Sequence, residues 1–446
     1  MHKSLTERDR QVIWHPYTQM KGAPEPLPIV KGEGVYLIDE SGNRYIDAIS
    51  NWWVTLHGHG HPYLAQKIYE QARELEQVIF AGFTHEPAVQ LAERLLEILP
   101  AGMSKVFFSD NGSTAVEVAI KMAIQYWKNR EGAQEASPFL IPSSRDLEKA
   151  KPLPLPLRKK ILSLSNAYHG DTFGAMSVSG RGLFTLPFED YLFEVEAVDI
   201  SEWGMVSSEW AERLSSAEFA CFIYEPLVQG AGGMKMYEAE RLNDLLKLCR
   251  QHGILCIADE VMTGFGRTGK LFASEYLDVQ PDIICLSKGL TGGMMALGAT
   301  VCTQAIYDAF LSDDKSKTFF HGHSYTANPI ACAAGNASLD LLLQDDCRNN
   351  IEKIISCHKE FALELSQSKH AKNIRQTGTI LAFEIETNSN DGYLNNISSI
   401  IHKKALQQGV LLRPLGNTVY VMPPYCIIND ELNKVYAVII DIIDKL

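Results

Sequence analysis

The chain has 446 residues, a formal net charge of -13 at pH 7, 46% hydrophobic residues and 21% charged residues. At this length the apolar content can fill a substantial core, so two packed lobes, or one large domain with a smaller one, are expected. The acidic balance, without a long basic run, argues against nucleic acid as a partner. Small anionic ligands remain compatible with it, because local geometry can bind them.

The first fourteen residues mix charged side chains with few apolar positions, which is not the pattern of a secretory signal. Apolar runs of membrane-spanning length are also lacking in the sequence. The nine cysteines are an odd number and form no C-x-x-C pair, so reduced core residues are expected. These features predict a cytoplasmic protein without membrane contact.

In chain order, residues 34–49 are typical of a β-hairpin that turns at Ser41-Gly42-Asn43. The middle of the chain then alternates short apolar runs with amphipathic stretches, which indicates a mainly parallel sheet in an α/β fold. Buried strands are predicted at residues 106–109, 161–164, 219–227, 254–261, 283–287 and 297–302. Helical periodicity is present at residues 114–127, 238–251 and 328–343.

Toward the C-terminus, residues 374–386 and 410–422 are predicted to form antiparallel strands flanked by helices. A smaller α+β lobe built from both termini would then join the large domain. The predicted division is an N-terminal part of the small domain at residues 1–50, a large domain at 51–329 and a C-terminal small domain at 330–446.

The proline-containing stretch from Arg130 to Lys160 interrupts this alternation. We expect it to be an exposed insertion at the periphery of the large domain. A docking segment for an unknown partner is the less favoured interpretation.

Two charged residues follow neighbouring predicted strands. Asp259 ends the strand that begins at Ile254, and Lys288 follows the strand that begins at Ile283. In open α/β sheets, ligands bind beyond the carboxyl ends of the strands, so both side chains are expected at one crevice. Taken alone, such a pair is more often a salt bridge than a site.

Two further features favour a ligand site over a simple salt bridge. The segment from Ser109 to Thr114 places small residues and free N–H groups at a helix N-terminus, which can bind a phosphate, although a simple capping box of Thr114 with Glu117 is an alternative. Tyr168 adds an aromatic ring at the same edge. Together with Asp259 and Lys288, these residues predict a site for pyridoxal 5'-phosphate, with Lys288 as its Schiff-base lysine.

Five motifs resemble those of the class III aminotransferases of fold type I, and the resemblance covers nearly the whole chain. They are Tyr168-His169-Gly170, Glu225-Pro226, Asp259-Glu260-Val261, Thr263–Gly269 and Ser287-Lys288-Gly289. Three more segments are similar to the biotin-pathway branch of that family: Trp14–Met20, Asn51-Trp52-Trp53 and Tyr168–Val178. This branch moves an amino group, usually from S-adenosylmethionine, to 8-amino-7-oxononanoate.

The resemblance implies a role for each of eleven residues. The catalytic residues would be Lys288, Asp259, which pairs with the ring nitrogen, and Tyr17. The cofactor would also contact Gly112, Ser113, Tyr168, His323 and Ser324. The substrate pocket would be formed by Tyr17, Trp52, Tyr168, Lys288, Gly322 and Arg413. Because His323 and Ser324 would reach the phosphate of the other subunit, the implied assembly is a homodimer with shared active sites.

One departure concerns the amino donor. His323-Ser324 stands where the best-known members carry Pro-Thr, and is similar to the branch that uses lysine as donor. The donor, S-adenosylmethionine or lysine, therefore stays open.

Four other functions were weighed. The histidines at 57, 59, 61, 321 and 323 suggest a metal-dependent hydrolase, but they have no acidic partner at a recurrent ligand spacing, so no metal is expected. The run Gly264–Gly269 matches the G-x-G-x-x-G fingerprint of nicotinamide enzymes, but a periodic helix does not follow it. A non-catalytic protein is disfavoured by Lys288 and Asp259. The runner-up is another class III enzyme, an ω-amino acid or diamine aminotransferase.

Overall fold

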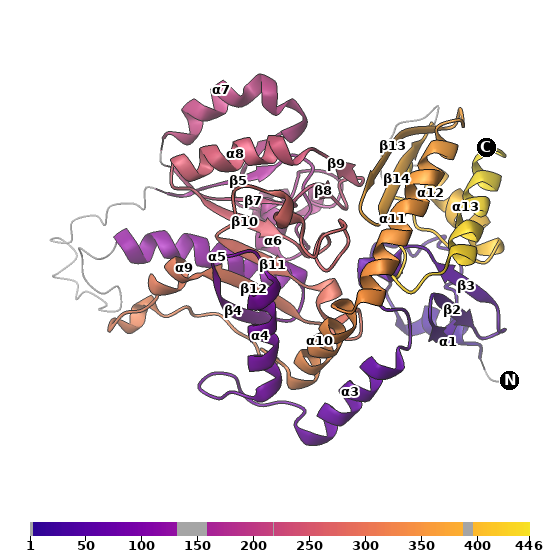
Figure 1. The fold of residues 1–446 in the computed structure, drawn as a ribbon, viewed down its shortest axis with the longest axis horizontal. Coiled ribbons are helices and arrows are strands. Elements are labelled where there is room, and N and C mark those ends of the chain that lie inside the picture. The colour runs from indigo at the N-terminus through magenta and orange to yellow at the C-terminus, as the bar shows by residue number, and fades with distance from the viewer. Residues whose placement is uncertain (1–2, 132–157, 217, 387–395) are drawn as a thin grey trace.

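A computed structural model describes residues 3–131, 158–216, 218–386 and 396–446 (Figure 1). The predicted insertion from Arg130 to Lys160 falls largely outside the described residues, since 132–157 are not among them. Helix α5 (Gly112–Glu131) ends before residue 132, and strand β5 (Lys160–Leu164) begins after residue 157.

Within the described residues, the central sheet has seven strands in the order β4-β12-β11-β10-β7-β5-β6. Their bounds are β4 Met103–Ser109, β12 Gly298–Thr303, β11 Ile283–Leu286, β10 Leu255–Asp259, β7 Phe219–Tyr224, β5 Lys160–Leu164 and β6 Glu196–Val198. Strand β12 alone runs opposite to the other six strands, so the expected mainly parallel sheet is confirmed. Sequence reasoning missed β6, which is only three residues long.

The inner strands are buried on both faces because their side chains alternate between two apolar clusters. Ile257 of β10 packs with α5 on one face, whereas its neighbours Cys256 and Ala258 pack with α8 (Ala239–Gln251) on the other. The same alternation holds for β7 and β11. The sheet therefore lies between two helical layers, and its carboxyl edge is fixed in place by packing on both sides.

The termini meet in a second lobe (Figure 1). Strand β3 (Arg44–Asp47) pairs antiparallel with β2 (Tyr36–Asp39), which confirms the predicted hairpin, and β3 also pairs with β15 (Val410–Leu411). Strand β14 (Ile380–Ile385) pairs antiparallel with β16 (Thr418–Val421), as predicted, and it also pairs antiparallel with β13 (Ala371–Thr377).

The prediction for 410–422 is wrong at β15, which runs parallel to β3. Its partner comes from the other end of the chain, which no local pattern reveals.

The domain boundaries proposed from the sequence stay a prediction. The remaining elements are α1 Leu5–Val12, β1 Ile29–Glu33, α2 Ser50–Trp53, α3 Pro62–Glu74, α4 Glu86–Ile98, α6 Phe173–Val178, η2 Leu186–Tyr191, η3 Ile200–Glu202, α7 Trp203–Leu214, β8 Val228–Gln229, β9 Lys235–Met236, η4 Ala273–Tyr276, η5 Lys288–Thr291, α9 Gln304–Asp308, η6 Lys315–Lys317, α10 Pro329–Leu342, α11 Asp345–Leu365, α12 Ile397–Gln407 and α13 Asn429–Ile443.

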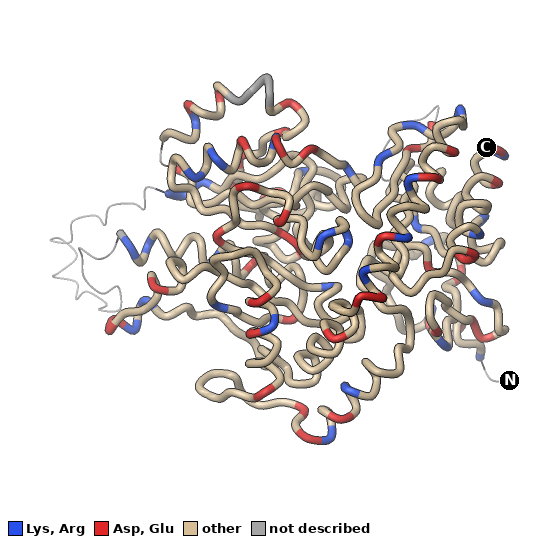
Figure 2. The backbone as a smooth tube through the Cα atoms, viewed as in Figure 1, with Lys and Arg blue, Asp and Glu red and all other residues tan. Residues whose placement is uncertain are grey.

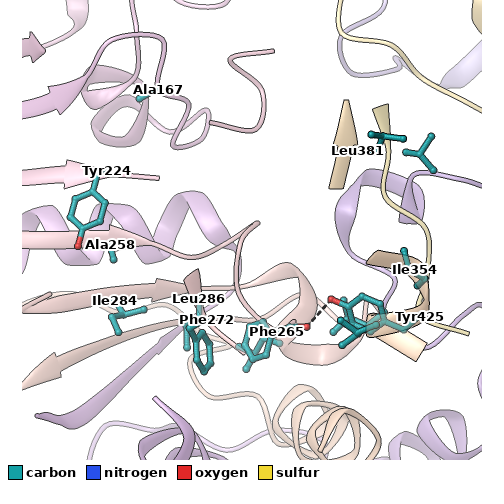
Figure 3. Packing of buried hydrophobic residues seen from close by; sticks show 14 of the residues in the cluster. Ala167, Tyr224, Ala258, Phe265, Phe272, Ile284, Leu286, Ile354, Leu381 and Tyr425 are labelled. Atoms are coloured by element: carbon teal, nitrogen blue, oxygen red, sulfur yellow. Dashed lines mark hydrogen bonds between the residues drawn. The ribbon is translucent and has the colours of Figure 1, made fainter. Parts of the chain in front are cut away.

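The glycine-rich run Gly264–Gly269 joins the two lobes. The buried Arg267 guanidinium donates to the carbonyls of Pro423 at 3.0 Å and Thr55 at 3.2 Å. Beside it the Tyr425 hydroxyl donates to the Phe265 carbonyl at 2.8 Å (Figure 3). Bends and the short 3-10 helix η4 follow this run instead of an α-helix, so it lacks the structure of a dinucleotide-binding fingerprint.

Acidic and basic residues are interspersed along the backbone of both lobes (Figure 2). All nine cysteines lie within the described ranges and are free, and six of them are buried. Within the same ranges, every helix is too short or too polar to cross a membrane.

The two-sided burial of β10 gives a stability prediction. Ile257 is fully buried, so Ile257→Ala should lower the free energy of unfolding by about 2–5 kcal/mol, because it leaves a cavity between the sheet and α5. Urea unfolding followed by intrinsic fluorescence measures the change. The control is Leu363→Ala on the exposed face of α11, which should change stability by less than about 0.5 kcal/mol. Equal effects of the two substitutions would contradict the packing described.

Candidate active site

A cavity of about 690 Å³ lies at the carboxyl edge of the central sheet. This is the edge and the size at which α/β enzymes hold small ligands. Its polar and aromatic walls include Trp53, Asp110, Asn111, Ser113, Tyr168, His169, Asp171, Thr172, Glu225, Asp259, Thr263, Ser287 and Lys288. Five of the predicted site residues therefore line one cavity: Gly112, Ser113, Tyr168, Asp259 and Lys288.

Lys288 stands where β11 ends, in a left-handed backbone conformation with φ of 44°. Such a conformation is costly for a residue with a side chain and often marks a functional position. The Lys288 Nζ lies 4.4 Å from the centroid of the Trp53 ring. Desolvation lowers the pKa of the Lys288 amine to about 8, against the opposing pull of Asp259 and Glu225. A larger share of the amine than in an ordinary lysine, about a tenth at pH 7, is therefore neutral and nucleophilic.

Asp259 ends β10 and is held from two sides. Its Oδ1 accepts the Val261 N–H at 3.0 Å, and its Oδ2 lies 2.7 Å from His169 Nδ1. The buried His169 Nε2 has no hydrogen-bond partner within the described part of the chain. The carboxylate is thereby fixed in orientation at the cavity wall, as a counter-charge for a ligand cation requires.

Glu225 is a site residue to which sequence reasoning gave no role. It follows β7 and is buried, and its two oxygens accept the backbone N–H groups of Tyr168 and Gly230, each at 2.9 Å. Burial raises the pKa of Glu225 to about 7, with His169 opposing the rise and Asp259 adding to it. The rule that singled out Asp259, a carboxylate at the end of an apolar strand, also identifies Glu225.

The N-terminus of α5 forms a narrow cradle. A Cβ on Gly112 would lie 2.6 Å from Val261 Cγ1, so only glycine fits there. The alternative of a Thr114–Glu117 capping box is wrong: Asn111 Oδ1 accepts the Thr114 N–H at 2.9 Å, and Glu117 instead accepts the Gly174 N–H at 2.6 Å. Gly112 and Ser113, the first residues of α5, line the cavity, and a helix N-terminus in this place can bind an anion.

Three polar side chains meet at the mouth of the cavity. The Tyr17 hydroxyl lies 3.0 Å from the Tyr168 hydroxyl and donates to Asp171 Oδ2. Burial, followed by the contact with Tyr17, raises the pKa of Tyr168 above its ordinary value. The predicted pair of Tyr17 and Tyr168 is therefore brought together, and Asp171, three residues after Tyr168, was missed because a lone carboxylate carries no signal of its own.

The two tryptophans divide between the cavity and its mouth. The segment Ser50–Trp53 has positive φ values at Ser50, Asn51 and Trp53, so its side chains do not alternate. Trp53 lines the cavity, and its indole N–H donates to the Tyr420 hydroxyl at 3.0 Å. Trp52 instead contacts Tyr17, with 5.3 Å between the centroids of the two rings.

Arg413 lies outside the cavity, beside Trp52. Its guanidinium carbon is 4.7 Å from the centroid of the Trp52 ring, which is a cation–π distance. The Arg413 side chain is exposed, so its donors are accessible to an anionic group that extends from the cavity past Trp52. The structure thus joins Arg413, Trp52 and Tyr17 in one cluster at the mouth.

Gly322, His323 and Ser324 are not among the described residues that line the cavity. The Ser324 carbonyl accepts from Gln77 Nε2 at 2.6 Å, and the His323 N–H donates to Thr326 Oγ1 at 3.0 Å. The predicted cofactor contacts of His323 and Ser324, and the predicted place of Gly322 in the substrate pocket, therefore have no counterpart within a single chain.

Two of the five histidines considered as metal ligands have separate partners. His57 lies 3.1 Å from Ser338 Oγ, and His59 lies 3.0 Å from Asp47 Oδ2. Burial lowers the pKa of His57 to about 3. Across the described ranges, no group of three or more His, Cys, Asp or Glu side chains could hold a metal ion.

The buried Glu225 predicts a pH dependence of stability. Its carboxyl pKa is about 7 in the folded chain against 4.5 in the unfolded chain, so ionisation costs folding free energy as pH rises between these values. Glu225→Gln cannot ionise, so the stability of the variant relative to the parent should rise by on the order of 1–3 kcal/mol from pH 5 to pH 8. Urea unfolding of the cofactor-free protein at both pH values measures it. Parallel pH profiles for the two proteins would refute the interpretation.

Comparison with known proteins agrees with this geometry. A family model for class III aminotransferases matches residues 17–443. The adenosylmethionine-8-amino-7-oxononanoate aminotransferase of Synechococcus elongatus is 47% identical over 97% of this chain and 99% of its own length. The crystal structure of the enzyme of the same name from Methanocaldococcus jannaschii is 34% identical, with a TM-score of 0.87, over 99% of this chain and 98% of that one.

A third relative is informative about the cofactor. An amine transaminase from an uncultivated Pseudomonas species, solved in its pyridoxal phosphate-bound form, is 31% identical, with a TM-score of 0.85, over 97% of this chain and 98% of that one. The family match spans nearly the whole chain and includes the strand ends that carry Asp259 and Lys288. On this evidence, the chain belongs to the class III aminotransferase family.

Proposed function

We propose that the protein uses pyridoxal 5'-phosphate to transfer an amino group from S-adenosylmethionine to 8-amino-7-oxononanoate, giving 7,8-diaminononanoate for biotin synthesis. The observation that carries the proposal is one cavity that unites Lys288, Asp259 and the N-terminus of α5. In the overall reaction, the amino group of the donor and the keto oxygen of the acceptor change places. The names of the relatives support this choice of substrates.

The residues of the cavity fit the cofactor. The glycine-only position at 112 and the N–H groups of α5 suit its phosphate, and the fixed carboxylate of Asp259 suits a protonated ring nitrogen. Lys288 supplies an amine that desolvation keeps partly neutral. When bound, the cofactor withdraws electrons from the substrate carbon that carries the amino group.

The side chains of this chain then have distinct tasks. Asp259 holds the proton on the ring nitrogen, and His169 keeps the Asp259 carboxylate in place. Lys288 Nζ binds the cofactor and moves a proton to and from the substrate carbon. Tyr168 and Trp53 exclude water from the cavity wall, and Tyr17 presents its hydroxyl to the substrate at the mouth.

The acceptor is a long aliphatic keto acid whose carboxylate lies far from its reacting carbonyl. The cluster of Tyr17, Trp52 and Arg413 offers an apolar wall and then a cation outside the cavity. A planar guanidinium binds a carboxylate through two parallel hydrogen bonds. This arrangement favours 8-amino-7-oxononanoate over the diamines of the runner-up function, which carry no carboxylate.

We further propose that the working form is a homodimer with shared active sites. Gly322, His323 and Ser324 lie outside the cavity of their own chain, and by family resemblance His323 and Ser324 serve the site of the other subunit. His323-Ser324 also keeps lysine as the alternative donor.

A donor panel tests the proposed function. The purified enzyme is incubated with 8-amino-7-oxononanoate and either S-adenosylmethionine, lysine or a diamine, and 7,8-diaminononanoate is measured by mass spectrometry. Product is expected with S-adenosylmethionine. Product with lysine alone would correct the donor, and absence of product with every donor would overturn the biotin-pathway assignment.

Lys288→Ala should abolish covalent attachment of the cofactor. Turnover should fall by at least about 100-fold, because the proton-transferring amine is lost. Borohydride reduction followed by peptide mapping is expected to label Lys288 in the parent enzyme and nothing in the variant. Lys270→Ala, outside the cavity, is the control and should keep the label. Labelling at another lysine would disprove the assignment.

Arg413→Ala should lower kcat/KM for the acceptor half-reaction. The expected loss is equivalent to about 1.5–3 kcal/mol, the range for a hydrogen bond to a charged group. The donor half-reaction should lose less, because S-adenosylmethionine carries its carboxylate next to the reacting carbon. Single-turnover absorbance of the cofactor measures each half separately. Arg348→Ala, an exposed arginine on α11, is the matched control. Equal losses in both halves would show that Arg413 does not recognise the acceptor carboxylate.

A further inference from the structure

Phe184 contacts both tyrosines at the mouth of the cavity. Its ring centroid lies 5.7 Å from that of Tyr17, with the planes at 84°, and 6.4 Å from that of Tyr168, with the planes at 68°. Both are edge-to-face arrangements, which the charge distribution of aromatic rings favours. Phe184 therefore touches, through its ring, the two side chains whose hydroxyls lie 3.0 Å apart.

The turn that carries Phe184 is held by its neighbours. The Arg181 guanidinium donates to the Ser177 carbonyl at 2.9 Å. The Gly182 N–H donates to Thr185 Oγ1 at 2.9 Å, and Thr185 is buried. Because the backbone is anchored on both sides of Phe184, the ring is presented in a defined place.

Tyr17 needs such support. It belongs to an N-terminal segment with little burial: none of the residues of α1, all of which the structure describes, is buried. Tyr17 itself is 42% exposed and has a positive φ of 53°. Its position therefore depends on side-chain contacts at the mouth, and the rings of Trp52 and Phe184 supply two of them.

We propose that Phe184 is a positioning residue for the acceptor. It braces Tyr17 against Tyr168, so that the two hydroxyls and the ring wall meet a long aliphatic keto acid in a fixed arrangement. This inference rests on the proposed function for the identity of that acid. Phe184 has no polar group, so its contribution is made through ring packing and acts on substrate binding more than on the chemical step.

Four variants test the proposal on the cofactor-loaded enzyme. Phe184→Ala removes the ring, Phe184→Leu keeps an apolar side chain without a ring, and Phe184→Tyr keeps the ring. Leu183→Ala is the matched control, since Leu183 lies on the same turn but is 46% exposed. The measurements are KM and kcat for the acceptor, the cofactor absorbance spectrum and the melting temperature.

We expect Phe184→Ala to raise KM for 8-amino-7-oxononanoate about tenfold, as the loss of two edge-to-face ring pairs would cause, while kcat changes by less than about twofold. Phe184→Leu should behave similarly, and Phe184→Tyr should restore KM to near the parent value. The absorbance spectrum and the melting temperature should match those of Leu183→Ala.

An unchanged KM in Phe184→Ala would overturn the proposal. So would a fall in kcat and melting temperature together that Phe184→Tyr fails to restore, because that would indicate a structural role alone. If the parent enzyme does not use 8-amino-7-oxononanoate, the proposed function fails, and the same variants are compared on the best acceptor from a panel of aliphatic keto acids. The role of Phe184 is then decided separately, by the KM of Phe184→Ala relative to the KM of the parent enzyme for that acceptor.

Discussion

The desolvation of Lys288 beside two buried carboxylates is the constraint on which the site depends. An ammonium removed from water is costly unless opposite charges lie close to it. Asp259 and Glu225 supply those charges and limit the fall of the Lys288 pKa to about 8. Only a parallel sheet brings three strand ends to one edge, and the register that sets Asp259 opposite Cys285 places it next to the strand end that leads to Lys288.

The same cavity requires the two lobes to stay together. Trp53 forms part of its wall in a left-handed backbone conformation, with φ of 69°, that costs free energy. The bond from Trp53 to Tyr420 and those from Arg267 to Thr55 and Pro423 join the N-terminal, central and C-terminal parts of the chain. The strain at Trp53 is therefore maintained by contacts from segments that are far apart in the sequence.

The sequence predicted the central sheet and the strand ends that form the floor of the cavity, because both follow from local sequence patterns. Apolar runs gave the buried strands, and the strand ends located Asp259, Lys288 and the cradle at Gly112. What it missed was set by pairing across the chain: the parallel partner of β15, the irregular turn at Trp52 and Trp53, and the ring of Phe184 beside Tyr17. Glu225 is a different case, because it shows the same pattern that identified Asp259: a carboxylate at the end of an apolar strand.

The division between floor and mouth explains how one family can act on many substrates. The floor consists of strand ends whose positions are fixed by packing on both faces of the sheet, so the chemistry that it supports cannot change without disturbing the core. At the mouth, beside Tyr168 and Asp171 of the cavity wall, Tyr17, Trp52, Phe184 and Arg413 come from four separate segments and contact one another mainly through rings and one cation. Fold and cofactor leave the substrate undetermined. We propose that the aromatic mouth selects it in this chain, because substitutions there can alter what the cavity admits without moving Lys288 or Asp259.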